Sequence, residues 1–188
     1  GAVAVFDIML TDDAVVQVSW GDGHCSTVRK GKEAWQRVEH IYSETSKRAE
    51  ERFVVTIEVE EAGHIIGYRH GFLDMETHYL DLSLCHNLQY LTAEFMRLLD
   101  LTHNPMLKEI TINGCEMEEI DLSANTKLER IDCHCSNFKW LNLSKNDKVR
   151  ELECWCCMDL TRVGISNNAS LQRLIMDKST PIDAPSLH

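Results

Sequence analysis

The stretch LERIDCHCSNFKWLNLSKN, residues 128–146, contains two short runs in which apolar and polar residues alternate. The first run is IDC at residues 131–133, and the second is LNLS at residues 141–144. Successive residues of a β-strand point to opposite faces, so each run predicts a strand with one apolar face. Such a short strand buries too little surface to be stable alone. We therefore expect the stretch to be one unit of a repeat whose copies stack on one another.

The second run recurs along the chain. Its pattern of two apolar residues around a spacer, followed by Ser or Thr, begins at Leu80, Leu99, Ile120, Leu141 and Val163, at intervals of 19, 21, 21 and 22 residues. Two positions after each Ser or Thr lies one member of a series that we call the ladder: Cys85, Asn104, Asn125, Asn146 and Asn168. A side-chain amide at this place can satisfy buried backbone groups of the neighbouring coil.

The first run belongs to a longer pattern, L-x-x-L-x-L-x-x-N/C-x-L, which begins at Leu107, Leu128 and Val149. This pattern is the signature of the leucine-rich repeat. Its L-x-L pair forms a strand whose apolar residues face inward, and each coil buries its apolar edge only against its neighbours. We therefore predict a mainly β fold that contains a solenoid of about five coils of 21 residues with a parallel sheet.

The eight cysteines have no spacing typical of small disulfide-linked proteins. The repeat accounts for five of them, which we expect to be buried free thiols: Cys133 and Cys154 at inward positions, and Cys85, Cys115 and Cys157 at turn positions. Cys135 and Cys156 lie outside both apolar series and become neighbours on adjacent coils. We expect free thiols there, with a strained disulfide or a soft-metal site beside His134 as alternatives. The sequence offers no second, separated pair of ligands, so no metal is predicted.

Upstream of residue 71 the leucine repeat is absent and the pattern alternates. It predicts strands near residues 2–9, 15–20, 35–42, 52–60 and 64–68, which together are typical of a small β-sandwich. Between the second and third of these strands lies WGDG, residues 20–23. Its glycines permit the positive φ of a tight turn, and Trp20 supplies a large core side chain.

These residues resemble the polycystic-kidney-disease (PKD) type of immunoglobulin-like domain. The family pattern of W-G-D-G, H-x-Y and Y-x-V-T-I/L-x-V is similar to residues 20–23, to His40 with Tyr42, and to residues 53–59. The resemblance implies a PKD-like β-sandwich over residues 1–70. Residues 71–188 then form the leucine-rich-repeat domain, with an irregular C-terminal end from Pro181.

The order of the two parts is similar to that in leucine-rich-repeat surface proteins of Bacteroidetes-type bacteria. Residues 131–133, 141–146, 152–154 and 165–168 carry this resemblance most specifically, and it extends from Val3 to about Thr180. It implies an exported protein at the cell surface or tethered to the outer membrane. The chain begins at Gly1 and not at Met, so we expect any signal peptide or lipid anchor to have been removed upstream.

Outward residues of the L-x-x-L-x-L strands line one side of the predicted sheet, which we call the repeat face. Its predicted members are Glu109, Thr111, Asn113, Arg130, Asp132, His134, Glu151, Glu153, Trp155, Arg173, Ile175 and Asp177. Solenoids often bind partners on such a rigid, shallow surface. Trp155 near Arg130 is the expected anchor, because Trp and Arg often carry interface energy. The sequence thus predicts a non-catalytic binding or adhesion module for a protein or glycan ligand, such as one from a host.

Two alternatives stay open. Mixed charge on a strand face is also typical of a surface that is merely solvated, and the chain would then be a structural spacer of the cell envelope. Cys135 and Cys156 would instead support a thiol redox or metal function.

Composition and the absence of motifs exclude several classes of function. A formal net charge of -11, from 19 basic and 30 acidic residues, disfavours nucleic acid as a partner. The longest apolar runs, such as residues 2–6, are too short for a membrane span. No catalytic or nucleotide-binding motif occurs, so we expect no enzyme and no cofactor. Asp12 and Asp13 with Asp22 lack the spacing of a calcium loop.

Overall fold

The computed structural model describes residues 3–12, 14–32, 34–42, 55–59, 64–70, 79–177, 180 and 182–183. These residues form strands joined by turns, which confirms the mainly β class. In the part of the chain so described, there is no helix of the length and apolar character that crossing a lipid bilayer demands.

Six strands form the N-terminal region: β1 (Val3–Leu10), β2 (Val15–Ser19), β3 (Cys25–Arg29), β4 (Trp35–Ile41), β5 (Thr56–Val59) and β6 (Ile65–His70). Strands β3, β2 and β5 form one antiparallel sheet, while β4, β1 and β6 lie together in another. Strand β3 was not predicted from the sequence. This strand lies at the edge of its sheet with no fully buried residue, so it lacks the apolar alternation by which strands are recognised.

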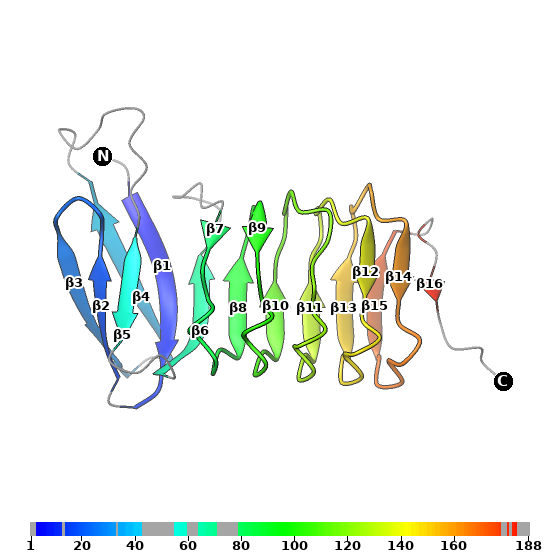
Figure 1. The fold of residues 1–188 in the computed structure, drawn as a ribbon, viewed down its shortest axis with the longest axis horizontal. Helices are drawn as coiled ribbons and strands as arrows, with labels where there is room; N and C mark the ends of the chain where they lie inside the picture. Colours follow the sequence, from blue (N-terminus) through cyan, green and yellow to red (C-terminus); the bar gives the residue numbers. More distant parts are fainter. Residues whose placement is uncertain are drawn as a thin grey trace.

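The repeats supply two further sets of strands. One set is parallel and in register: β8 (Tyr90–Ala93), β10 (Glu109–Thr111), β11 (Arg130–Asp132), β13 (Glu151–Cys154) and β15 (Arg173–Met176). The other set forms short parallel pairings: β7 (Tyr79–Leu80), β9 (Leu98–Leu99), β12 (Trp140–Asn142), β14 (Arg162–Gly164) and β16 (Ile182–Asp183). Figure 1 shows the coils stacked side by side, which confirms the predicted solenoid with its parallel sheet. Strand β16 lies inside the tail that was predicted to be irregular.

Register between coils places the apolar residues in one continuous core. Ile110 lies opposite Ile131, which in turn lies opposite Leu152, and all three are at most 1% exposed. The buried side-chain amides of the ladder residues also join neighbouring coils. The Asn125 amide nitrogen donates to the carbonyl oxygens of Leu101 and Asn104, both at 2.9 Å, and Asn104 and Asn146 repeat this pattern.

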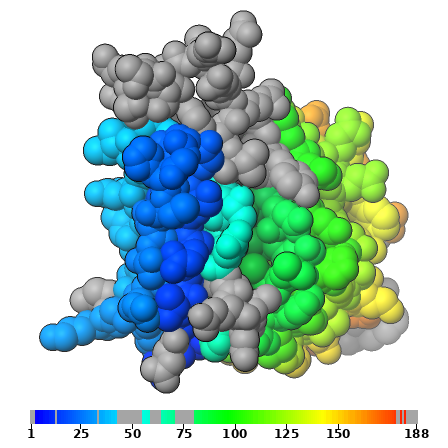
Figure 2. Space-filling view, turned by 60° about the vertical axis from the view of Figure 1, so that its left-hand side comes forward, coloured from blue at the N-terminus to red at the C-terminus, as the bar shows by residue number. Residues whose placement is uncertain are grey.

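The N-terminal region and the repeats share one eight-stranded sheet. Strand β6 pairs with β1 in the antiparallel sense and with β8 in the parallel sense. Figure 1 shows this continuity, and in Figure 2 the cyan surface that contains β6 lies directly beside the green surface of the first coils. The side of the sheet that carries the repeat face therefore extends onto β6, β1 and β4. The predicted boundary at residue 71 falls among residues outside the described ranges and stays a prediction.

Aromatic residues connect the two sheets of the N-terminal region. The ring centroid of Phe6 on β1 lies 5.8 Å from that of Trp20, which follows β2, and 5.7 Å from that of Tyr68 on β6. Trp20 is fully buried, as predicted, and Gly21 and Gly23 have φ values of 78° and 91° in the turn that follows. Assignment of this region to the PKD type stays a prediction.

Candidate functional site

The register of the parallel strands aligns outward side chains into rows across the repeat face. One row runs through Tyr90, Glu109, Arg130, Glu151 and Arg173. From Glu109 onward the charges in this row alternate in sign. Opposite charges on directly facing positions of neighbouring strands stabilise the pairing, so the charges of this row attract one another from strand to strand.

Glu153 sits at the centre of an ionic network on this face. Its carboxylate lies 3.8 Å from the guanidinium of Arg130 and 3.4 Å from that of Arg173, and its side chain is 15% exposed. Arg130 also pairs with Glu151 at 3.2 Å. The two arginines are thus held at the surface by carboxylates from the strand between them, in fixed positions.

Just beyond the ends of β11 and β13, His134 and Trp155 form an aromatic pair. The rings of His134 and Trp155 are stacked, with centroids 4.6 Å apart and planes 7° from parallel. His134 Nδ1 lies 2.7 Å from Asp132 Oδ1, which orients the imidazole. Trp155 remains 42% exposed. The structure therefore presents one large aromatic side chain that is accessible and also held in place.

Other members of the predicted repeat face are less accessible. Thr111, Ile175 and Asp177 are half-buried. Asn113 is only 7% exposed, so the prediction that it faces solvent is wrong. Its backbone carbonyl accepts the N–H of Phe95 at 2.9 Å, and the Phe95 ring packs against the neighbouring Gly114, so the chain of the preceding coil crosses close to this position.

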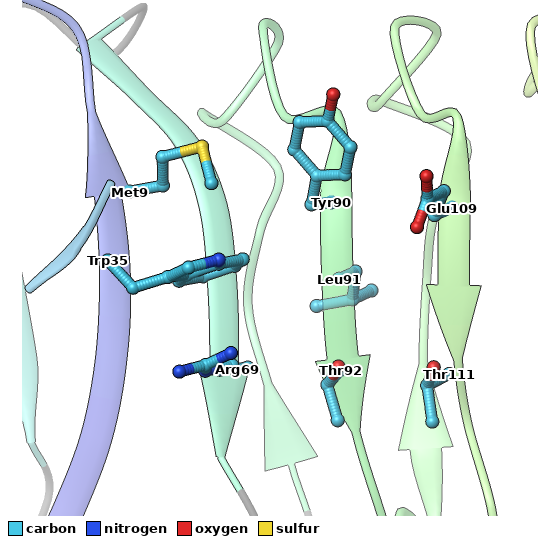
Figure 3. Close-up of a pocket in the computed structure, with 8 residues that line it drawn as sticks. All are labelled: Met9, Trp35, Arg69, Tyr90, Leu91, Thr92, Glu109 and Thr111. Atoms are coloured by element: carbon cyan, nitrogen blue, oxygen red, sulfur yellow. The ribbon is translucent and has the colours of Figure 1, made fainter. Parts of the chain in front are cut away.

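A pocket of about 350 Å³ lies on the same side of the sheet, where the repeats meet the N-terminal strands. Figure 3 shows its lining residues, which are Met9, Trp35, Arg69, Tyr90, Leu91, Thr92, Glu109 and Thr111. In this view Trp35 lies between Met9 and Arg69. The Arg69 guanidinium lies 4.5 Å from the centroid of the Trp35 ring, and Arg69 Nε donates to Asp7 Oδ2 at 2.9 Å.

Gly67 makes room for this arrangement. A Cβ atom at Gly67 would lie 2.7 Å from the far edge of the Trp35 ring and 2.9 Å from the Cβ of Met9. The pocket was missed by the sequence analysis because its residues come from β1, β4, β6, β8 and β10, on both sides of the predicted domain boundary. One signal was present: a glycine inside a predicted strand often marks the close approach of another group.

All eight cysteines are free. Cys115, Cys133, Cys154 and Cys157 are buried as predicted, whereas Cys85, the first member of the ladder, is only half-buried. Cys135 and Cys156 are exposed, with φ values of 55° and 58°. Desolvation and the neighbouring Cys156 thiol raise the pKa of Cys135, so its reactive thiolate form is disfavoured.

Comparison with known proteins yields matches among solved structures only: no protein-family model and no curated protein matches the sequence. The functional domain of InlJ from Listeria monocytogenes, described as including a cysteine ladder, is 21% identical with a TM-score of 0.48; the match covers 58% of this chain and 24% of that one. An internalin, InlF, from the same species is 17% identical with a TM-score of 0.40; this match covers 54% of this chain and 37% of that one. The chain therefore spans well under two thirds of either protein's length.

Proposed function

We propose that this chain is a non-catalytic, exported binding module that holds a protein ligand on the outward side of its eight-stranded sheet. The stacked pair of His134 and Trp155 carries this proposal. Exposed Trp side chains are frequent centres of binding energy, and a rigid one loses little conformational freedom when a partner covers it. The His134 ring and the Asp132 carboxylate hold Trp155 in this way before any partner arrives.

Charge on the repeat face supports a protein ligand in preference to a glycan. Arg130 and Arg173 alternate with Glu109, Glu151 and Glu153, and their ion pairs keep both signs at fixed places. A partner with its own positive and negative side chains would match this pattern, and such matching favours specific association. An apolar side chain of the partner would cover Trp155.

The pocket lined by Trp35 and Tyr90 provides a second contact region on the same side. Strands β8, β10 and β11 connect it to β13, which ends one residue before Trp155. A shallow surface that spans several strands, with an aromatic group toward each end, fits an extended protein partner better than a small molecule.

The test compares two exposed tryptophans of the solenoid. Trp155 is 42% exposed on the repeat face, and Trp140 is 48% exposed on β12, which belongs to a different sheet. Biolayer interferometry against a panel of purified extracellular proteins and glycans identifies the ligand. We expect Trp155→Ala to weaken binding by at least tenfold, on the order of a hot-spot truncation, and Trp140→Ala to leave it unchanged.

The outcomes separate this function from its alternatives. Equal binding by the wild type and Trp155→Ala would exclude the repeat face as the binding surface. Ligands found only among the glycans would replace the protein partner with a carbohydrate. A complete lack of binding across the panel would favour a structural spacer.

A further inference from the structure

Three potential metal ligands come together where the turn between β2 and β3 approaches the end of β4. Asp22 and His24 lie in the turn, and His40 lies near the end of β4. One donor atom from each residue can be chosen so that all three atoms lie within 4.8 Å of one another. Gly21 and Gly23 make this possible, because their positive φ values fold the turn back toward β4.

Both imidazoles point at the same oxygen atom. His40 Nε2 lies 2.8 Å from Asp22 Oδ2, and His24 Nδ1 lies 3.2 Å from it. The other carboxylate oxygen, Oδ1, accepts the backbone N–H of His24 at 3.0 Å. The backbone N–H of His24 therefore fixes the carboxylate through Oδ1, while the ring nitrogens of His24 and His40 converge on Oδ2.

These separations are close to those of a tetrahedral site. Zn²⁺ binds His nitrogen at about 2.0–2.1 Å and carboxylate oxygen at about 2.0–2.2 Å, which places neighbouring ligand atoms roughly 3.3–3.5 Å apart. The His24 contact is nearly that long already, and the His40 contact would have to open by about half an ångström. That opening requires a small shift of the His40 ring or the Asp22 carboxylate, whereas His24, whose side chain is 73% exposed, already lies near the required distance.

Residues around the cluster hold two of the three ligands in place. Trp20 stacks on His40 with ring centroids 4.9 Å apart and planes 15° from parallel. The Trp20 indole N–H donates to Ser26 Oγ at 2.8 Å, and the Tyr42 hydroxyl donates to the Trp20 carbonyl oxygen at 2.9 Å. The side chains of Asp22 and His40 are only 5% and 15% exposed. Ligands supported in this way lose little freedom on binding a metal.

We propose that Asp22, His24 and His40 form a binding site for a divalent transition-metal ion such as Zn²⁺. Two imidazoles and one carboxylate suit zinc, nickel or copper, whereas calcium takes oxygen ligands alone. Three protein ligands leave the fourth tetrahedral position to a water molecule or to a group from a partner. The ion would cross-link the β2–β3 turn to β4. Because it would bind only to the folded chain, it would stabilise the N-terminal region.

The experiment uses untagged protein in which the exposed cysteines Cys25, Cys135 and Cys156 are replaced by Ser, so that thiols at the surface cannot hold the probe. Isothermal titration with Zn²⁺ should give one ion per chain, and Zn²⁺ should raise the melting temperature. His24→Ala removes an exposed side chain and should lower the affinity at least tenfold, as the loss of a metal ligand does. His103→Ala, an exposed histidine in the repeats, should leave the affinity unchanged.

Nuclear magnetic resonance of the histidine rings gives a second readout. Zn²⁺ should shift the ring signals of His24 and His40 and leave those of His103 in place. Retention of zinc affinity in His24→Ala, an equal loss in His103→Ala, or no zinc binding once the three thiols are replaced would each overturn the proposal.

Discussion

The repeats and the N-terminal strands use buried polar groups in opposite ways. In the repeats, one amide per coil performs the same task again and again, as Asn104, Asn125 and Asn146 each donate to two carbonyls of the preceding coil. In the described part of the N-terminal region, a cluster around Trp20 and Asp22 joins a turn to β4 without any periodic counterpart. Periodic polar groups leave a clear trace in the sequence, whereas a single cluster leaves residues that are scattered along it.

The same contrast appears on the surface. The repeat face is assembled from the same outward positions of each coil, so neighbouring strands align their side chains in rows and Glu109, Arg130 and Glu151 alternate in charge. The pocket at the junction combines Trp35, Arg69 and Tyr90 from strands that are not periodic. Regular stacking therefore produces a uniform surface, and the irregular cap of N-terminal strands produces the hollow beside it.

The largest effect is expected for a ladder residue. Asn125→Ala leaves the carbonyls of Leu101 and Asn104 without their buried donor, which should lower the free energy of unfolding by about 2–4 kcal/mol in urea titrations. Asn142→Ala in the next coil is the control, since this exposed residue only caps the N–H of Ser144 and should cost less than about 1 kcal/mol. Similar losses from both substitutions would contradict the structural role of the ladder.

Replacing one glycine by alanine in each region sharpens the comparison. Gly67→Ala places a methyl group against Trp35 and Met9, so we expect a loss of about 1–3 kcal/mol and a change in tryptophan fluorescence. In the repeats, a Cβ at Gly164 would come no closer than 3.5 Å to Asn142 Oδ1, and Gly164→Ala should change stability by no more than about 0.5 kcal/mol. Chemical denaturation measures both. Tolerance of Gly67→Ala would mean that Trp35 does not lie where the pocket requires it.

A smaller effect should appear only in mildly acidic solution. Burial lowers the pKa of His70 on β6, and the backbone of Glu94 opposes this shift only in part. The folded protein therefore resists protonation of His70, and stability should fall as the pH drops below the unfolded value of about 6.5. Melting temperatures between pH 7.5 and 5 should decline more steeply for the wild type than for His70→Leu. Parallel declines would show that other groups control the acid response.

The smallest effect on stability is expected on the repeat face. Arg130→Ala removes two ion pairs, but Glu153 keeps its contact with Arg173, so the loss should stay below about 1 kcal/mol. Thermal melting at low and high salt checks this value. A loss above 2 kcal/mol, larger than surface pairs supply, would indicate that the charged row serves mainly to hold the strands together.

The sequence by itself predicts the solenoid, its parallel sheet and the inward-facing residues. The reason is physical: each coil meets almost the same environment, so local alternation and the 21-residue spacing repeat the same constraint many times. It also located Trp155 on an outward position. It did not predict that His134 would stack on this residue, because lateral contacts depend on the register between coils.

Long-range pairing accounts for what the sequence did not show. Strand β3 was missed because it has little apolar alternation, and Asn113 was expected at the surface because the crossing of the Phe95 backbone is not visible locally. Most of all, the pairing of β6 with both β1 and β8 merges two regions into one sheet and creates the pocket between them. Such contacts join residues far apart in the chain, so no local pattern encodes them and only the folded arrangement brings their side chains together.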